Sequence, residues 1–364
     1  MFVAFIAQVG ARFARDLSWS GLAEFAVMFA MVWIAWMNGS LYHEVHGRDD
    51  GRHRAYLFTQ MFLLILLAAF AHDATTTRAT EFAVTYAALM GVFTFQWWVV
   101  YRIDTVPRFR RYAGLYTIQL GAIALIVLAS AWSSGPARLL IWAGAIAVAL
   151  VAIASNLVRA EGEAEGSPVA ATESLAERFA LLTIIVLGEI VVGVVNGMLE
   201  ADTTAPAVAA GLLGLAVGFG FWWNYFDALG ERTPRNSSRA LAPWLLLDVP
   251  LHGAVVAAGV GMVTLIGHAE AGTVAPETRW LLAGSTALLL ILVAALARTI
   301  DYPDRASDVL LPFQIAMFAG ALLCIGIALL PVPAWLFAVL LIVVLSTTWF
   351  FAFALRTRCD PHEP

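Results

Sequence analysis

The stretch LLTIIVLGEIVVGVVNG, residues 181–197, places one carboxylate, Glu189, in a run that is otherwise almost entirely apolar. The whole chain has this character, since 61% of its residues are hydrophobic, 13% are charged and the mean hydropathy is +0.81. Soluble domains have roughly 45–50% apolar and about 25% charged residues. The composition therefore predicts a membrane protein and leaves no segment for a soluble catalytic domain.

Apolar runs of about 20 residues, long enough to cross a bilayer as helices, alternate with short charged loops. We predict spans at 21–42, 55–72, 82–101, 112–132, 137–158, 174–198, 206–229, 241–266, 280–300, 309–330 and 334–355. The stub MFVAFIAQVGARF is too short to cross and has no basic residue before its apolar run, unlike a signal peptide. We expect it to be the second half of a helix. The fold class is thus an all-α polytopic membrane protein with about 12 transmembrane helices, the first one truncated.

All 21 basic residues are arginine, which excludes a lysine Schiff base and therefore a retinal-binding rhodopsin. Most of them lie in the C-terminal tail and in the loops after even-numbered helices, with the stub as the first. The positive-inside rule then predicts a cytoplasmic C-terminus. Cys324 and Cys359 are not placed for a disulfide framework or a metal cluster. The small net charge of −5 predicts no nucleic-acid partner.

Two segments of the chain resemble each other. WIAWMNGSLYHEVHGRDDGR (33–52) and FWWNYFDALGERTPR (221–235) each pass from an apolar helix through tryptophan and asparagine into a charged loop, which pairs Asn38 with Asn224. Asp104 and Asp301 likewise each follow the end of a span. We predict two parallel six-helix repeats, 1–158 and 174–364, joined by a linker at 159–173. Transporters built from repeated halves bind their substrates near the bilayer midplane.

Glu189 lies well inside its predicted span, where a charge costs roughly 2.5–3.5 kcal/mol on insertion scales. Aliphatic neighbours return only about 0.3–0.6 kcal/mol each, yet together they still allow insertion. Helical spacing predicts Gly193, Asn196 and Gly197 on the same face, and the two glycines form a GxxxG step that lets another helix approach closely. Two interpretations remain open: Glu189 takes up and releases protons, or it stays protonated and hydrogen-bonds to a helix backbone.

Asp248 and His252 lie four residues apart, on one helix face, with Pro250 between them. This pair suits a proton relay or a cation site. The alternative is a local hydrogen bond near the end of a helix.

Asn224 and Asp227, at the end of the eighth predicted helix, can line a vestibule together with Asn38, or cap helix ends. Four glutamines in or near spans are expected to form interhelical hydrogen bonds: Gln60, Gln96, Gln119 and Gln314.

The segment YHEVHGRDDGRHR, 42–54, contains HExH but not the HExxH of zinc enzymes, and we expect a solvated loop. We expect Gly211, Gly214 and Gly218 to form a packing ridge. Motifs of nucleotide-binding loops, nucleophile elbows and dinucleotide sites are missing from the sequence. We therefore assign no catalytic residue, metal or cofactor.

The segment ESLAERFALLTIIVLGEIVVGVVNG, 173–197, resembles the bacterial low temperature requirement protein A (LtrA) family. The resemblance rests on Glu177, Arg178 and Phe179, on IIVLGE with Gly188 and Glu189, and on WWNYFD (222–227), and it runs over essentially the whole chain. FVAFIAQVG stands where the family has an opening helix of the type ELFFDLVFVFAIAQL, without its carboxylates, and DVPL (248–251) stands where HLPL is common. The resemblance implies a polytopic bacterial inner-membrane protein linked by name to growth in the cold.

Our leading hypothesis is a proton-linked secondary transporter of a small or amphipathic solute, with Glu189 as the protonatable group between two six-helix halves. One alternative is a lipid-handling membrane protein or enzyme that uses Glu189 and the Asp248/His252 pair for acid–base chemistry on a head group. Another is a sensor or scaffold whose polar groups only fasten helices together. The expected partners are membrane lipids and a small solute or proton.

Overall fold

The computed structural model describes residues 1–47, 50–161, 172–230, 232–235, 237–300 and 307–359. Within these ranges every regular element is a helix, apart from one bridge between Pro234 and Ile300. Eleven helices are long and apolar enough to cross a membrane, and α1 (Phe2–Ala14) is shorter. The structure therefore confirms the predicted all-helical fold with about 12 helices.

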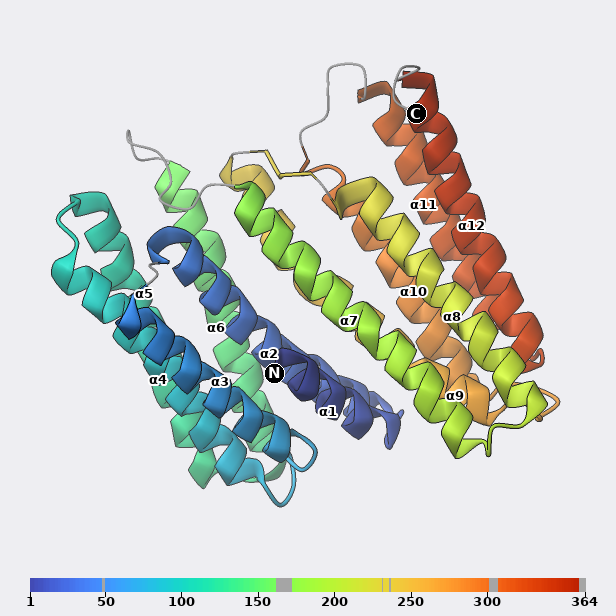
Figure 1. Cartoon of the computed structure of the whole chain (residues 1–364), viewed down its shortest axis with the longest axis horizontal. Helices are drawn as coiled ribbons and strands as arrows, with labels where there is room; N and C mark the ends of the chain where they lie inside the picture. Colours follow the sequence, from blue (N-terminus) through green and yellow to red (C-terminus); the bar gives the residue numbers. More distant parts are fainter. Residues whose placement is uncertain (48–49, 162–171, 231, 236, 301–306, 360–364) are drawn as a thin grey trace. The chain divides into compact units, whose positions relative to one another are not determined.

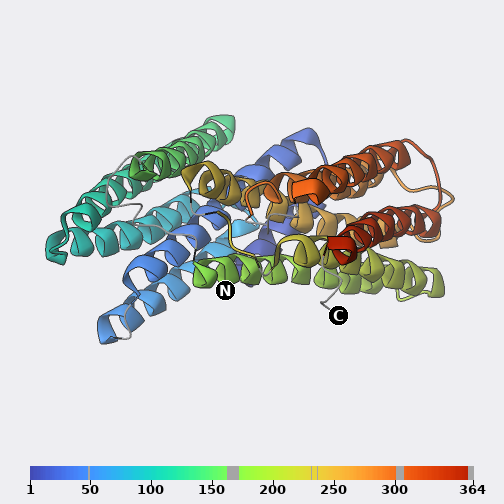
Figure 2. The same ribbon diagram turned by 90° about the horizontal axis from the view of Figure 1, so that it is seen from above.

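The chain divides into two compact units, Met1–Ala170 (unit 1) and Ala171–Pro364 (unit 2). The other helices of unit 1 are α2 (Trp19–His46), α3 (Gly51–Ala71), α4 (Ala79–Ile103), α5 (Pro107–Ala129), the short η1 (Ser130–Trp132) and α6 (Gly135–Glu161) (Figure 1). Unit 2 contains α7 (Glu173–Glu200), α8 (Ala205–Tyr225), the π-helical turn η2 (Phe226–Gly230), α9 (Ser238–Gly267), α10 (Pro276–Leu296), α11 (Ser307–Ala328) and α12 (Ala334–Cys359). Figure 2 shows the helices of unit 2, green to red, running side by side along their lengths.

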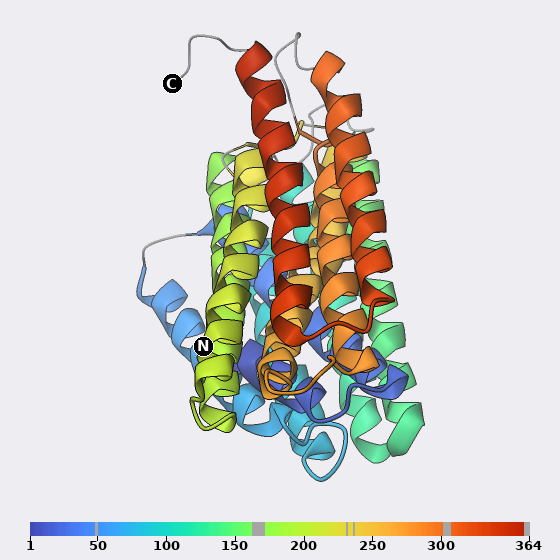
Figure 3. The ribbon, with the colours of Figure 1, turned by 90° about the vertical axis from the view of Figure 1, so that its right-hand side faces the viewer.

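The two units share one pattern of helix neighbours. In unit 1, α1 contacts α2 and α3, α4 contacts α3 and α5, and α6 contacts α2 and α5. In unit 2, α7 contacts α8 and α9, α10 contacts α9 and α11, and α12 contacts α8 and α11. Helices α11 and α12 lie side by side in the foreground of Figure 3. When α1 is matched with α7 and the rest follow in order, each of these contacts has a counterpart in the other unit.

Asn38 and Asn224, the pair on which the predicted repeat rests, also have matching local hydrogen bonds. The Asn38 side chain donates to the carbonyl oxygen of Ile34, and that of Asn224 donates to Gly220, in both cases four residues back and at 2.8 Å. The repeat itself stays a prediction. Asp301 and most of the predicted linker, residues 162–171, lie outside the described residues, whereas residues 159–161 continue α6.

The loop predicted at residues 42–54 is shorter in the structure, because both flanking helices extend into it. Helix α2 continues to His46, and α3 begins at Gly51 because the Asp50 carboxylate accepts a 2.7 Å hydrogen bond from the His53 N–H and caps that helix. His43 Nδ1 and His53 Nε2 lie 3.0 Å apart and link the two helices. Across the described ranges, no group of three or more histidine, cysteine or acidic side chains is arranged to hold a metal ion.

The glutamine prediction is confirmed, since all four side chains hydrogen-bond to a neighbouring helix. Gln60 donates to Gln96 at 2.9 Å, Gln119 and Asn156 bond to each other at 2.8 and 3.2 Å, and Gln314 donates to the Ala294 carbonyl at 2.9 Å. Such bonds satisfy polar groups that would otherwise be bare in an apolar setting.

Candidate functional site

Helices α7 and α9 meet through glycines. A Cβ on Gly193 would overlap the carbonyl oxygen of Gly259, and one on Gly197 would come within 3.1 Å of Val263 and Ile266. The predicted close approach at the GxxxG step is therefore confirmed, and α9 is the partner. Gly193 faces Gly259, and Gly197 faces Val263 and Ile266, so residue numbers increase in the same direction along both helices. Helices α7 and α9 are therefore parallel.

The predicted glycine ridge of α8 packs against the other side of this contact. A Cβ on Gly211 would come within 2.8 Å of Met198, one on Gly214 within 3.1 Å of Met262, and one on Gly218 within 3.0 Å of Ile190. The ridge is thus confirmed as a packing surface. It brings α8 close to both α7 and α9.

Glu189 lies on the buried face of α7 and is 7% exposed. Its carbonyl oxygen is 2.9 Å from the position of a Cβ on Gly259, so its backbone lies directly against α9. Among the described residues, its Oε1 atom is buried and has no hydrogen-bond partner. Leaving such a group bare costs about 1–3 kcal/mol, and more when it is charged. A proton, a cation or a water molecule bound there would remove this cost.

Asp248 and His252 are paired inside α9. Asp248 Oδ2 lies 2.9 Å from His252 Nδ1, and the two residues are 4% and 0% exposed. Thr183 of α7 lies on the other side of the ring, with its hydroxyl 2.7 Å from His252 Nε2. Tyr225, at the end of α8, interacts with both the Asp248 carboxyl group and the Thr183 hydroxyl. We call these four residues the Asp248 cluster.

Local sequence explains how α9 presents the pair. The spacing of four residues puts both side chains on one face, and Pro250, inside the helix, has no N–H to donate to the carbonyl of residue 246. At the start of the contact, the rings of Phe179 and Trp244 pack with centroids 4.8 Å apart. This packing and the glycine contact near Gly193 hold Thr183 beside His252 from either side.

Both ring nitrogens of His252 keep a hydrogen-bond partner whether or not the ring carries a second proton. With the proton bound, both ring nitrogens of His252 donate, to Asp248 and to Thr183, and the Thr183 hydroxyl donates to the Phe179 carbonyl oxygen at 3.3 Å. Without it, the hydroxyl turns and donates to Nε2, and Nδ1 still donates to Asp248. The imidazolium and carboxylate are neutral together, whereas the second state carries one negative charge that a proton or cation would neutralise.

Asn224 and Asp227 connect helices. Asn224 is buried and donates to Gly220 and, at 3.0 Å, to the carbonyl of Leu345 in α12, while its Oδ1 accepts from Thr348 at 3.0 Å. Asp227, within η2, accepts a hydrogen bond from the Trp349 ring N–H. Each of the two residues thus links the end of α8 or η2 to α12. Asn38 is also buried, and its Oδ1 has no partner among the described residues.

The remaining predicted residues lie around α7. Asn196 is exposed, so the structure does not bring it into the contact with α9, although its spacing from Glu189 predicted a shared face. Glu177 is exposed, Arg178 is half-buried, and a Cβ on Gly188 would meet nothing within 4 Å. Phe179 is fully buried against Trp244.

Sequence reasoning missed Thr183, Tyr225 and Gly259. Thr183 does carry a signal, because it lies one turn after the buried Phe179 and thus on the face that Glu189 approaches further along the helix. Tyr225 follows Asn224 directly, but a tyrosine at the end of an apolar helix is also typical of a membrane interface. Gly259 is one of several glycines in α9, and only the packing distinguishes it.

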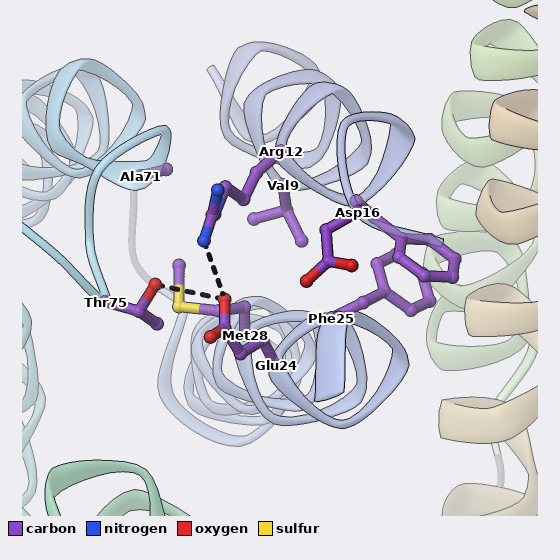
Figure 4. Close-up of a pocket in the computed structure, with 10 residues that line it drawn as sticks. Val9, Arg12, Asp16, Glu24, Phe25, Met28, Ala71 and Thr75 are labelled. Carbon is purple, nitrogen blue, oxygen red and sulfur yellow. Dashed lines mark hydrogen bonds and ion pairs between the residues drawn. The ribbon is translucent and has the colours of Figure 1, made fainter. Parts of the chain in front are cut away.

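Unit 1 has a second charged site, where α1 turns into α2 (Figure 4). Arg12 and Thr75 both reach the Glu24 carboxylate, at 3.3 and 3.0 Å, beside a hollow of about 10 Å³. Hydrogen bonds from Ser18 keep the pKa of the Asp16 carboxyl below its ordinary value. The hollow has room for about one water molecule. The hydrogen bonds of Glu24 beside it link α1, α2 and the turn after α3.

The family model described as bacterial low temperature requirement A protein (LtrA) matches residues 1–346. No curated protein and no solved structure matches the chain. The family match includes α7, α8 and α9 and thus every residue of the Asp248 cluster. The chain belongs to the bacterial low temperature requirement A (LtrA) family, as a membrane protein with many apolar helices.

Proposed function

We propose that this protein is a proton-linked secondary transporter of a small or amphipathic solute, and that the Asp248 cluster and Glu189 bind the coupled proton. The observation that carries the proposal is the hydrogen-bonding of His252, between an acidic side chain and a hydroxyl that can either accept or donate. Such a group binds and releases a proton with a small rearrangement.

Glu189 is the second proton-binding group in this proposal. It lies six residues after Thr183 on α7, which corresponds to about 9 Å along the helix axis, and faces the same partner helix, α9. Its bare Oε1 atom is an open acceptor. Intramembrane ionisable groups commonly mark ion pathways and proton relays. A proton or a cationic group of the solute would bind there.

The shared neighbour pattern of the two units supports transport over a single-purpose scaffold. Parallel repeats are a recurring architecture of transporters, whose halves arose from one bundle. We extend the proposal to residues 1–158 and 174–364 as the two repeats. The family match supports a location in a bacterial membrane, which we propose to be the cytoplasmic one, and the distribution of arginines supports a C-terminus in the cytoplasm.

Infrared difference spectra of the purified protein at two pH values test proton binding directly. We expect carboxyl and imidazole bands that change with pH, with parts of the difference lost in Glu189→Gln, Asp248→Asn and His252→Gln. Glu177→Gln is the matched control, because Glu177 is an exposed glutamate on the same helix, and its spectrum should keep the bands assigned to the other three. If all four variants give the spectrum of the parent protein, these groups do not titrate and a structural role replaces the proposal.

A further inference from the structure

One end of unit 1, where α4 ends and α5 begins, combines exposed arginines with exposed aromatic rings. Arg102, Arg110 and Arg111 are exposed, and Trp98 and Tyr101 are 42% and 37% exposed. The guanidinium of Arg102 lies over the Trp98 ring, 5.7 Å from its centroid, and that of Arg110 lies 5.2 Å from the centroid of Tyr101. We call these five residues the arginine–aromatic surface.

Cation–π contacts prepare these guanidinium groups for an anion. A ring close to a guanidinium restricts the side chain, and the group keeps its five N–H donors. The N–H groups at the edge of a guanidinium can donate two parallel hydrogen bonds to the oxygens of a phosphate. Arg102 and Arg110 are thus held in a geometry that costs little further ordering when a phosphate binds.

The charge around this surface is strongly positive. Ring contacts of His46 with Trp97 and Phe109 bring the end of α2 to the same end of the unit. Helix α3 starts there as well, with Arg52 and Arg54 exposed in its first turn.

The described acidic groups at this end are fewer, and two of them serve the backbone. They are Glu44, Asp50, which caps α3, and Asp104, which accepts from the Val106 N–H at 2.8 Å. Against them stand the five exposed arginines already named and the half-buried Arg108. The excess of positive charge therefore attracts anions.

An apolar surface continues from the arginines along α3 and α4. Trp98 stacks on Phe95, with centroids 5.6 Å apart, and Phe95 contacts Tyr56 of α3 at 6.1 Å. A free phosphate would use only the arginine edges, whereas a phospholipid would use these edges and the apolar surface together.

We infer that the arginine–aromatic surface binds the phosphate headgroup of anionic phospholipids, with their acyl chains along the exposed aromatic face of α3 and α4. Each arginine near an anionic lipid surface strengthens binding by about a factor of five. Removal of three such charges should therefore weaken binding by about 100-fold. A zwitterionic lipid, whose headgroup has no net charge, should bind weakly to the parent protein and its variants alike.

Native mass spectrometry of the full chain in detergent, titrated with phosphatidylglycerol or phosphatidylcholine, measures this binding. We expect phosphatidylglycerol to bind the parent protein tightly and the variant Arg102→Gln, Arg110→Gln, Arg111→Gln about 100-fold more weakly. The control replaces three exposed arginines elsewhere, Arg78, Arg239 and Arg298, with glutamine and should bind like the parent. If the triple variant does not fold, Arg110→Gln alone should lower affinity about fivefold.

Three outcomes would overturn the inference. Equal binding of both lipids to the parent protein would show that the headgroup charge is not recognised. An equal loss in the control variant would show that overall charge, and not this surface, attracts the lipid. Displacement of phosphatidylglycerol by equimolar inorganic phosphate would show a site for a soluble anion.

Discussion

Two glycines of α7 provide a matched test of the contact between α7 and α9. A Cβ on Gly188 would meet nothing within 4 Å, whereas a Cβ on Gly193 would overlap the Gly259 carbonyl oxygen. Replacement of a helical glycine by alanine favours the helix by about 1 kcal/mol in either case. This gain cancels when the two variants are compared. Overpacking against a backbone that cannot withdraw typically costs about 1–3 kcal/mol, so we expect Gly193→Ala to be less stable than Gly188→Ala by this amount.

Unfolding of the purified protein in mixed micelles by increasing sodium dodecyl sulfate, followed by far-ultraviolet circular dichroism, gives both free energies. Gly188→Ala should equal or exceed the stability of the parent protein, and Gly193→Ala should fall below Gly188→Ala. The reciprocal change, Gly259→Ala, should also destabilise, because its Cβ would lie 2.9 Å from the carbonyl oxygen of Glu189. Equal stability of the two α7 variants would refute the close backbone contact on which the position of Glu189 depends.

Three further predictions concern the polar groups. Thr183→Val keeps the side-chain shape but leaves His252 Nε2 without its partner. It should therefore lower the free energy of unfolding by about 1–3 kcal/mol and abolish the pH-dependent imidazole bands in infrared spectra. Thr183→Ser, which keeps the hydroxyl, should retain these bands. Asn224→Leu should lower the free energy of unfolding by about 1–3 kcal/mol more than Asn38→Leu, since Asn224 hydrogen-bonds to α12 whereas the described bond of Asn38 stays within its own helix. The same titration measures both, and equal losses would contradict this. Asp50→Ala should remove the cap of α3, at a cost of about 1 kcal/mol, and speed hydrogen exchange of the His53 amide without affecting amides in the middle of α3.

Hydropathy alone predicted the helices because every backbone group in a bilayer must be satisfied within its own segment. It misplaced the ends of the loop predicted at residues 42–54, where charged side chains extend helices beyond the apolar core and Asp50 supplies a cap. The glycine spacing at 193 and 197 predicted that a helix approaches, but the identity of that helix depends on the fold. Spacing also predicted a shared face for Asn196, which is exposed. The contact with α9 follows Gly193 and Gly197, and Asn196 lies about 100° around the helix from Gly197.

The buried polar groups were only partly predictable for a related reason. Asp248 and His252 stand out in an apolar run because charged types are rare there, and their spacing of four gives the pairing. Thr183 and Tyr225 are common in membrane helices and stand out only once α7, α8 and α9 are packed. The residues that they contact belong to other helices, and a single sequence does not show which helices pack against each other.

Accessibility of position 189 from both sides of the membrane tests the central claim most directly. The chain has only two cysteines, Cys324 and Cys359, so Glu189→Cys can be made in a background in which both are serine and labelled with membrane-impermeant thiol reagents in sealed vesicles of each orientation. A second cysteine variant at Glu200, which is exposed at the end of α7, should be labelled from one side only and checks that the protein is folded and the reagent is active. Proton-linked transport predicts labelling of position 189 from both sides, to an extent that changes with pH. Complete protection from both sides, in a folded protein, would contradict transport and make Glu189 a packed structural group.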